Sequence, residues 1–235
     1  TALANHSSVT DPLAVQALVD QAMNEWGRID ILVNNAGILR DKSFSKMTLE
    51  DFLAWEAEQP ERWEFFNGEA FMMAGGSDIH HAISLNTAFA LRQTLRGTRC
   101  NVFMSDVRLR RAEDDNLFYP DVFVTCSDAD RARRQVKEDP VLIAEVLSPS
   151  TEAHDRGDKF AAYRRFAGLK TVLFLSQDRA HVECFTRGED GRWILSEASG
   201  YTARLALPAF GFELALADLY RDLPDAASEP AATAN

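Results

Sequence analysis

Two carboxylates in apolar segments are the residues of this sequence best placed to do chemistry. Glu145 lies inside the run Val141–Leu147, and the alternation of a strand puts it on the same face as Ile143. Asp121 begins a second apolar run directly after Pro120. An ionised carboxylate among apolar side chains costs several kcal/mol unless a cation or a hydrogen-bond donor compensates it. Each carboxylate is therefore either a structural group, in an ion pair or at a strand end, or a ligand.

Lys159 is the cation that could balance these carboxylates. It falls on the apolar stripe of a helix predicted over 156–167, which should face the sheet, and an inward lysine needs a carboxylate partner. Asp155, four residues earlier, offers a surface ion pair as the alternative. Asp121 and Glu145 on neighbouring strands, with a lysine beside them, predict a divalent-metal site. Hard oxygen ligands favour Mg²⁺ or Mn²⁺, which can activate a water and offset charge on a phosphoryl group.

The composition limits the classes of partner. The 235 residues are 46% hydrophobic and 26% charged, which excludes collagen-like, coiled-coil and wholly disordered chains. The net charge of −11 argues against a nucleic-acid coat protein with a broad basic face, but it leaves room for a local basic groove. Arginine runs of the kind found here are also typical of a solvated surface. The candidates for a groove are Arg92, Arg96, Arg99, Arg108, Arg110, Arg111, Arg131, Arg133 and Arg134.

The three cysteines, Cys100, Cys126 and Cys184, are odd in number and far apart. No pair has the spacing of zinc ligands, so the sequence predicts neither a zinc site nor a disulfide framework. No apolar run approaches the roughly 18 residues that a membrane helix needs, and no signal segment is recognisable at the start. We therefore expect a cytoplasmic protein that does not contact a membrane.

The order of the apolar segments predicts an α+β fold over 47–223, with a mixed sheet flanked by helices. Asn67-Gly68 between two aromatic segments predicts a hairpin. The residues 224–235 have the composition of a disordered tail. Strands are predicted at 100–104, 107–110, 121–125, 141–147, 171–176, 182–187, 193–196 and 203–205. A helix over about 78–96 should bury a stripe formed by Ile79, Ala82, Leu85 and Phe89.

The first 46 residues form a separate piece. A helix begins after Asp11 and ends at Gly27, and Ile29–Val33 predicts a short buried strand. The segment GRIDILVNNAG at 27–37 resembles the fourth-strand segment of the short-chain dehydrogenase/reductase family, where the Asn-Asn-Ala-Gly turn steadies the sheet beside a nicotinamide cofactor. No Gly-rich phosphate-binding turn precedes it, and no tyrosine of the chain is followed by a lysine four residues later. We interpret 1–46 as an incomplete Rossmann α/β fragment without catalytic activity.

A second resemblance covers 47–223. Its motifs are Trp63-Glu64-Phe65, Asn67-Gly68-Glu69, Gly75-Gly76-Ser77 with His80, Tyr119-Pro120-Asp121-Val122, the segment EVLSPST from Glu145 to Thr151, and Asp155, Lys159 and Tyr163. On these motifs the sequence resembles the Uma-two-type putative restriction endonuclease family, within the PD-(D/E)xK nuclease superfamily. The resemblance implies a restriction-endonuclease-like mixed sheet flanked by helices.

The resemblance also implies roles for single residues. Asp121 and Glu145 would be the metal ligands. The superfamily usually has its lysine two residues after the glutamate, where this chain has a leucine, so Lys159 on the following helix would take that role. Glu69 resembles an upstream acidic position and is an additional candidate ligand or water-orienting residue, with a hairpin surface carboxylate as the alternative. His80 is a further catalytic candidate, although capping or packing explains it as well.

These features predict a Mg²⁺- or Mn²⁺-dependent DNA endonuclease. The metal held by Asp121 and Glu145 would generate the attacking hydroxide, and Lys159 would stabilise the charged transition state. DNA is the expected substrate, and the sequence leaves a homodimer open. A second hypothesis is a catalytically inactive binding module that keeps the nuclease fold. A third is a fragment of an NAD(P)-dependent short-chain reductase.

Overall fold

The chain divides into two compact units, Thr1–Ser43 and Phe44–Asn235. The computed structural model describes residues 12–29, 47–73, 75–149 and 151–223. In the first unit, helix α1 (Pro12–Trp26) ends at Gly27, which has a φ of +73° and donates its amide to the carbonyl of Met23, as the sequence predicts. The predicted strand at 29–33, the turn that follows it and the tail 224–235 extend outside the described residues.

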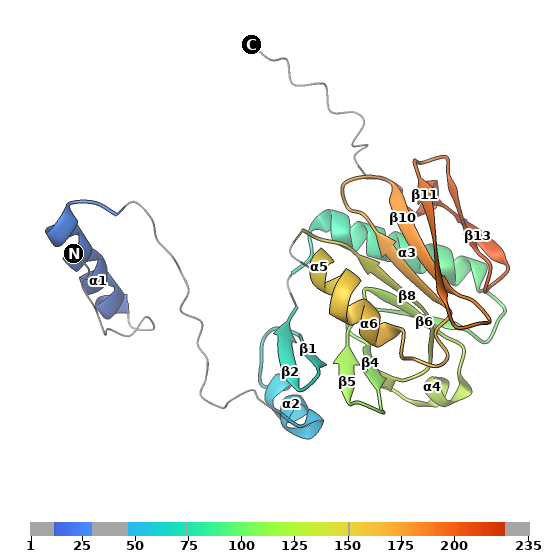
Figure 1. Cartoon of the computed structure of the whole chain (residues 1–235), viewed down its shortest axis with the longest axis horizontal. Helices are drawn as coiled ribbons and strands as arrows, with labels where there is room; N and C mark the ends of the chain where they lie inside the picture. Colours follow the sequence, from blue (N-terminus) through green and yellow to red (C-terminus); the bar gives the residue numbers. More distant parts are fainter. Residues whose placement is uncertain (1–11, 30–46, 74, 150, 224–235) are drawn as a thin grey trace, which may run out of the picture. The chain divides into compact units, whose positions relative to one another are not determined.

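A six-stranded mixed sheet forms the centre of the second unit (Figure 1). In order across the sheet its strands are β11 (Trp193–Ser199), β10 (His181–Arg187), β9 (Thr171–Leu175), β8 (Pro140–Val146), β6 (Val122–Thr125) and β3 (Asn101–Met104). Only β8 and β9 run parallel, and the other neighbours are antiparallel. The crossover between the parallel strands consists of α5 (Glu152–His154), a π-helical turn (Asp155–Lys159) and α6 (Phe160–Tyr163).

A five-stranded sheet contains the predicted hairpin. In order its strands are β2 (Glu69–Met72), β1 (Trp63–Phe66), β5 (Asn116–Phe118), β4 (Arg108–Arg111) and β7 (Val136–Lys137). Asn67 and Gly68 have φ values of +54° and +87°, the backbone that a two-residue type I′ turn requires and that Asn-Gly favours. The remaining short helices of this part are α2 (Leu49–Glu56) and α4 (Asp128–Ala132).

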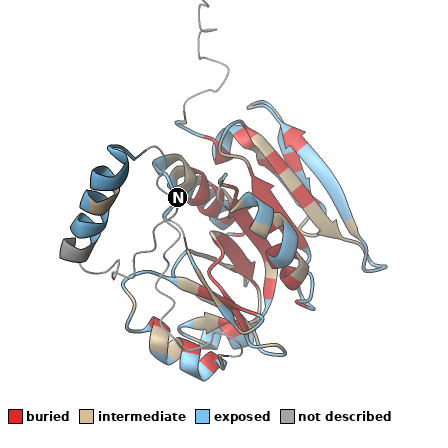
Figure 2. Cartoon of the chain, turned by 60° about the vertical axis from the view of Figure 1, so that its left-hand side comes forward, coloured by how far each residue is buried: buried red, intermediate tan, exposed pale blue. Residues whose placement is uncertain are grey.

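Apolar cores cover both faces of the six-stranded sheet, whose central strands β6, β8 and β9 are largely buried (Figure 2). On one face, Ile83 and Leu91 of α3 (Asp78–Thr94) pack into a core that β12 (Arg204–Leu207), β13 (Phe212–Ala215) and α7 (Leu216–Leu219) complete. On the other face, Phe160 and Tyr163 of α6 pack with Ile143 of β8. The predicted α+β fold, a mixed sheet between helices, is therefore confirmed. Within the described residues, no helix has both the length and the apolar character that crossing a membrane requires.

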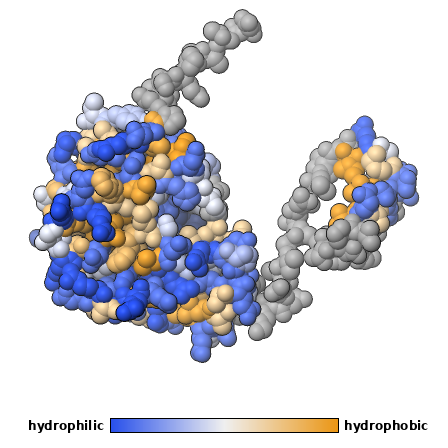
Figure 3. Space-filling model, turned by 180° about the vertical axis from the view of Figure 1, so that it is seen from behind, coloured by the Kyte–Doolittle hydropathy of each residue, from blue (hydrophilic) through white to orange (hydrophobic). Residues whose placement is uncertain are grey.

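The buried stripe of α3 differs from the predicted one. Leu85 and Phe89 are 60% and 54% exposed, whereas Ile83, Thr87 and Leu91 are buried at four-residue spacing. The predicted stripe is right for Ile79, which packs against this core, and wrong for Leu85 and Phe89. The true stripe passes through a threonine, which a search for apolar residues does not select. Several large apolar side chains therefore remain on the surface, and Figure 3 shows apolar patches among hydrophilic ones on the face seen from behind.

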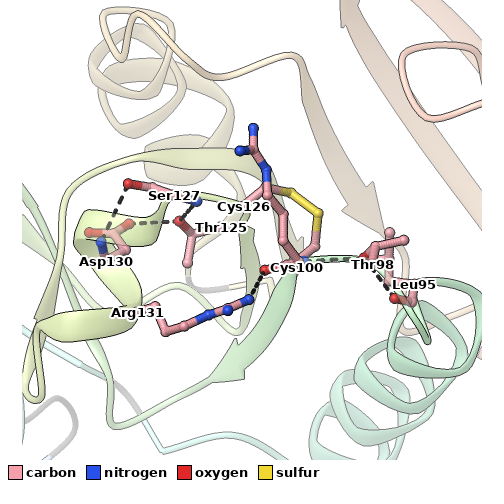
Figure 4. Close-up of a disulfide and its surroundings, with 9 residues drawn as sticks. Leu95, Thr98, Cys100, Thr125, Cys126, Ser127, Asp130 and Arg131 are labelled. Atoms are coloured by element: carbon pink, nitrogen blue, oxygen red, sulfur yellow. Dashed lines mark hydrogen bonds between the residues drawn. A yellow bond between two sulfur atoms is a disulfide. The ribbon is translucent and has the colours of Figure 1, made fainter.

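Cys100 and Cys126 form a disulfide, which corrects the prediction that the chain has none (Figure 4). The register of β3 and β6 pairs Asn101 with Thr125, so the two cysteines stand opposite each other one position further along. Their sequence separation of 26 residues gives no hint of this before the strand pairing is known. Cys184, the remaining cysteine, is free and buried.

Replacing Cys100 and Cys126 together by alanine should lower the free energy of unfolding by about 3 kcal/mol, because the bond restricts the unfolded chain. Urea unfolding without reductant compares the double variant with the parent. The parent in dithiothreitol is the matched control and should unfold at the same urea concentration as the double variant. Equal stability of parent and double variant without reductant would contradict the prediction.

Candidate functional site

Asp121 and Glu145 lie side by side because β6 and β8 are neighbouring antiparallel strands. The register pairs Val122 with Ala144, so the residue before Val122 meets the residue after Ala144. The amide of Asp121 donates to Glu145 Oε2 at 3.2 Å, and the amide of Val146 donates to Asp121 Oδ2 at 2.8 Å. Two backbone amides thus orient both carboxylates, and the two lie on adjacent strands as the sequence predicts.

Lys159 reaches the same cluster from the crossover. Its Nζ lies 3.0 Å from Glu145 Oε1, 3.1 Å from Glu64 Oε1 and 3.5 Å from Asp155 Oδ1. The lysine and its three partners are all buried, so the ammonium group has exchanged water for carboxylates. The Asp155–Lys159 pair is therefore part of the interior cluster and not the surface ion pair that was the alternative.

Asp155 and Lys159 are the first and last residues of a π-helical turn. The sequence predicts one continuous helix over 156–167, but the structure begins the helix at Glu152 and inserts the wider turn before α6. The amide of Phe160 donates to the carbonyl of Asp155, five residues earlier. Residues four apart also share a side of an α-helix, so the pairing of Asp155 with Lys159 follows from their spacing. π-Helical turns are rare and occur frequently at functional sites.

The structure brings Glu64 to the cluster and leaves Glu69 outside it. Glu69 is exposed at the start of β2, the position of a hairpin surface carboxylate. Glu64 is buried on β1, where its Oε1 accepts a hydrogen bond from the amide of Tyr119 at 2.9 Å and meets the lysine. The acidic residue of the hairpin that reaches the cluster is therefore Glu64, five residues before the predicted candidate Glu69. The sequence does contain a signal for burial of Glu64, because this residue lies between aromatic residues, just as Glu145 lies between aliphatic ones.

Two further side chains hold the carboxylates in place. The hydroxyl of Tyr163 donates to Glu145 Oε1 at 2.5 Å, and His80 Nε2 lies 2.8 Å from Asp121 Oδ1. The amide of His80 donates to Ser77 Oγ, the N-cap of α3. The imidazole of His80 therefore contacts the cluster through Asp121. The helix cap involves only the backbone amide of His80, so capping does not account for the position of the imidazole. Its Nδ1 is buried without a hydrogen-bond partner among the described residues.

The cluster contains more acidic than basic groups, and this excess of negative charge helps to raise the pKa of Glu145. Burial, the largest cause, and the charges of Asp121, Asp155 and Glu64 raise the pKa of Glu145 to about 8, although Lys159 opposes the rise. Burial also lowers the pKa of Lys159, but the attraction of the carboxylates outweighs it and holds that pKa well above its ordinary value. The lysine is therefore charged at neutral pH, and Glu145 takes up a proton more readily than an exposed glutamate does.

The pKa values of His80 and Tyr163, the two side chains that orient the carboxylates, are both raised. Burial lowers the pKa of His80, but the hydrogen bond to Asp121 and the charge of that aspartate outweigh burial and raise the pKa above the usual histidine value. Burial and the charge of Glu145 hold the pKa of Tyr163 well above its ordinary range. Tyr163 therefore remains a neutral hydrogen-bond donor to the glutamate.

The donor set fits a hard divalent cation. Mg²⁺ is usually held by one or two carboxylates, and waters and substrate phosphates complete its octahedron. Asp121 and Glu145 supply two adjacent carboxylates, and the excess negative charge that raises the pKa of Glu145 is charge that such an ion would offset. A carboxylate must be deprotonated to bind a metal, so binding would displace the proton of Glu145.

Most of the arginines considered for a basic groove are engaged in the structure. Arg108 donates to Glu56 Oε2 and to the hydroxyl of Tyr119, both at 2.7 Å. Arg131 donates to the carbonyl of Arg99. The other ion pairs of this group are Arg110 with Asp115, Arg111 with Asp114, and Arg133 with Asp130 and Glu138. Such pairing reduces the positive charge available to a polyanion.

Replacing Gly76 by alanine should displace His80 from Asp121. A Cβ on Gly76 would lie 2.8 Å from Cδ2 and 3.0 Å from Cγ of His80, closer than such atoms approach. We expect a loss of stability of about 1 to 3 kcal/mol and a lower pKa for His80, since Asp121 would no longer raise it. Histidine NMR titration measures that pKa. Gly75→Ala is the matched control, because nothing lies within 4 Å of a Cβ there. An unchanged His80 pKa in Gly76→Ala would refute the assignment.

Without metal, the stability of the protein should fall as the pH rises from about 5 to 8. In this window folded Glu145 keeps its proton while the unfolded side chain, with a pKa near 4.5, has lost it. The folded state then binds more protons, so stability declines by at most about 1.4 kcal/mol per pH unit from this group. Glu145→Gln should give a flatter profile in urea unfolding with EDTA, and exposed Glu69→Gln should keep the parent slope. The same slope in Glu145→Gln as in the parent would rule out this origin.

The first residues of the chain match one family over a short stretch. The model of the short chain dehydrogenase family matches residues 1–56. The peroxisomal hydratase-dehydrogenase-epimerase of Saccharomyces cerevisiae is 49% identical over 51 residues, which are 22% of this chain and 5% of that protein. The predicted resemblance of the N-terminal piece to this family is confirmed. The match covers too little of the relative to carry its activity.

The remainder of the chain matches a different family. A putative nuclease belonging to DUF820 from Anabaena variabilis has the same fold, with a TM-score of 0.60 at 17% identity over 74% of this chain and 97% of that one. The uncharacterized protein slr1290 of Synechocystis is 36% identical over 180 residues, 77% of this chain and 94% of the relative. The family model Uma2, described as "Putative restriction endonuclease", matches residues 49–217. The chain therefore belongs to the Uma2 family, with a nuclease fold.

Proposed function

We propose that the Uma2 part of the chain hydrolyses phosphodiester bonds of DNA with Mg²⁺ or Mn²⁺. One observation carries the proposal. The ammonium group of the buried Lys159 lies within 3.1 Å of Glu145 and Glu64. Glu145 is in turn hydrogen-bonded to the amide of Asp121, next to the neighbouring strand β6. Strongly perturbed carboxyl groups next to a fixed cation are typical of catalytic sites. The family and its fold support the same class of reaction, hydrolysis by a nuclease.

Asp121 and Glu145 would hold the cation. When bound, it supplies positive charge at the scissile phosphate and lowers the pKa of a water. Lys159 keeps its own charge in place through Glu64 and Asp155, so the ammonium group can offset negative charge that develops on a phosphoryl oxygen.

Tyr163 and His80 would act as positioning residues. Tyr163 fixes the Glu145 carboxylate by donating to Oε1, and His80 fixes Asp121 through Oδ1. Each contact is made to one oxygen of one carboxylate and keeps that carboxylate from rotating. Orientation of this kind by a second set of residues usually matters to metal sites nearly as much as the ligands do.

The DNA backbone would approach beside β4. A hollow of about 320 Å³ is lined there by residues that include Arg62, Arg108, Tyr119 and Arg134. Arg108 and Arg62 already pair there with Glu56 and Asp106, so a phosphate would compete with these carboxylates for the guanidinium groups. The overall charge of −11 opposes a polyanion, and we therefore expect DNA binding to be local and to weaken steeply with salt.

Nicking of supercoiled plasmid with added Mg²⁺ or Mn²⁺ tests the proposal. Asp121→Asn and Glu145→Gln should each reduce the rate by on the order of 100-fold or more, because each removes a ligand of the metal. Lys159→Met should reduce it by a similar factor, because it removes the positive charge beside the phosphate. Chelation of the metal should abolish cleavage.

Two exposed residues serve as controls. Glu69→Gln removes a carboxylate outside the cluster, and Lys170→Met removes a lysine outside it, so both should cut as the parent does. If the three cluster variants cleave as fast as the parent, the activity belongs to a contaminant and the assignment fails. If the pure parent does not cleave yet retains DNA, the protein is the inactive binding module.

A further inference from the structure

Three side chains of types that bind metals come from β10 and β11, two neighbouring strands that are labelled in Figure 1. His181 and Glu183 are two residues apart on β10, so both point to the same face of the sheet. Glu197 of β11 stands directly opposite Glu183 in the register. The three side chains therefore meet over one point of the sheet surface. The sequence offered no such grouping, because the pairing of the two strands creates it.

The distances within this group suit ligands of one ion better than a direct hydrogen bond. His181 Nε2 lies 3.6 Å from Glu197 Oε1 and 3.9 Å from Glu183 Oε1, beyond the usual 2.7–3.2 Å of an N–H···O bond. Ligand atoms about 2.0–2.2 Å from a tetrahedral Zn²⁺ are roughly 3.4 Å apart. One ligand atom from each of the three residues lies within 4.8 Å of the others. A modest adjustment of exposed Glu197 would close the group on an ion.

The surroundings fix the orientation that a ligand needs. Ser199 Oγ lies 2.7 Å from His181 Nδ1, so Nδ1–H can donate to the serine and leave the lone pair of Nε2 available to an ion between it and the glutamates. Arg156 forms an ion pair with Glu183 Oε2, which leaves Oε1 facing the histidine. Contacts of this kind to the far side of each ligand are the usual support of a metal site.

Arg156 compensates the charge of Glu183, and Glu197 adds a second negative charge beside it. Glu183 and Glu197 are directly opposed on adjacent strands, where like charges destabilise a sheet. Their side chains differ in access, since Glu183 is 15% exposed and Glu197 is 54% exposed. His181 is 12% exposed, so an ion here would be reached from the side of Glu197. His181 and Glu183 also line a hollow of about 420 Å³, which leaves space for a water on the ion.

The group is separate from the catalytic candidate. The register aligns Glu145, Phe174, Glu183 and Glu197 in one row across β8, β9, β10 and β11. Two strand spacings separate Glu145 from Glu183, which is about 10 Å. Paired catalytic ions lie about 3.5–4 Å apart, so the two groups cannot form one such centre.

We propose that His181, Glu183 and Glu197 bind one Zn²⁺ ion, with water in the open position. Imidazole with two carboxylates favours zinc and similar transition metals, whereas the carboxylate pair Asp121 and Glu145 favours Mg²⁺. The inference does not depend on the proposed nuclease activity. A protein that cuts no DNA can hold this ion, and an active nuclease can lack it.

Calorimetric titration of the full chain with zinc chloride, in millimolar Mg²⁺ to occupy harder sites, tests the proposal. The parent should take up one equivalent. His181→Gln and Glu197→Gln should each abolish this uptake, and Ser199→Ala should weaken it about 10- to 100-fold. Replacement by Co²⁺ should give the visible absorption of a tetrahedral site in the parent and not in His181→Gln.

Two further variants separate the sites. His154→Gln, which removes an imidazole stacked on Phe71, should bind as the parent does, and so should Asp121→Asn. Zinc uptake by His181→Gln equal to that of the parent would overturn the proposal, and so would loss of uptake in Asp121→Asn. Melting temperatures in EDTA show whether each variant is folded. If His181→Gln is not folded, zinc uptake by Glu197→Gln, whose substitution is at an exposed position, tests the proposal instead.

Discussion

One buried ammonium group organises the interior around the carboxylates. Lys159 lies in contact with Glu145, Glu64 and Asp155, which come from β8, β1 and the crossover. Removing any one partner would leave charge in an apolar environment that has little water to screen it. The lysine therefore ties three separate parts of the chain to one point, and the geometry of Asp121 and Glu145 depends on their staying there.

The topology of the sheet makes that meeting possible. Antiparallel pairing of β6 with β8 sets Asp121 against Glu145, and parallel pairing of β8 with β9 requires a crossover. The crossover returns over the face that carries Glu145, and Lys159 at the end of its π-helical turn contacts the glutamate. The hairpin of β1 and β2 then adds Glu64 from a different sheet.

The sequence predicted those parts that depend on local pattern. Alternation placed Glu145 on an inward face, Asn67-Gly68 gave the hairpin, and the amphipathic helix marked Lys159 as inward. What it missed depends on pairing between distant segments. The disulfide of Cys100 requires the register of β3 with β6, and the choice of Glu64 over Glu69 requires knowledge of which strand of the hairpin faces the core. The buried stripe of α3 was missed because Thr87 fills a core position that apolar periodicity assigns to larger residues.

The proton on Glu145 has a consequence for the order in which the molecule is assembled. A carboxyl group with a pKa of about 8 lets the interior close while the cluster is only modestly charged. Small domains built around structural zinc stay unfolded without the ion, because their site does not exist before the ion binds. At the proposed nuclease site, folding would not need the ion. A newly made chain would then fold first and take up the ion afterwards, releasing a proton to the solvent.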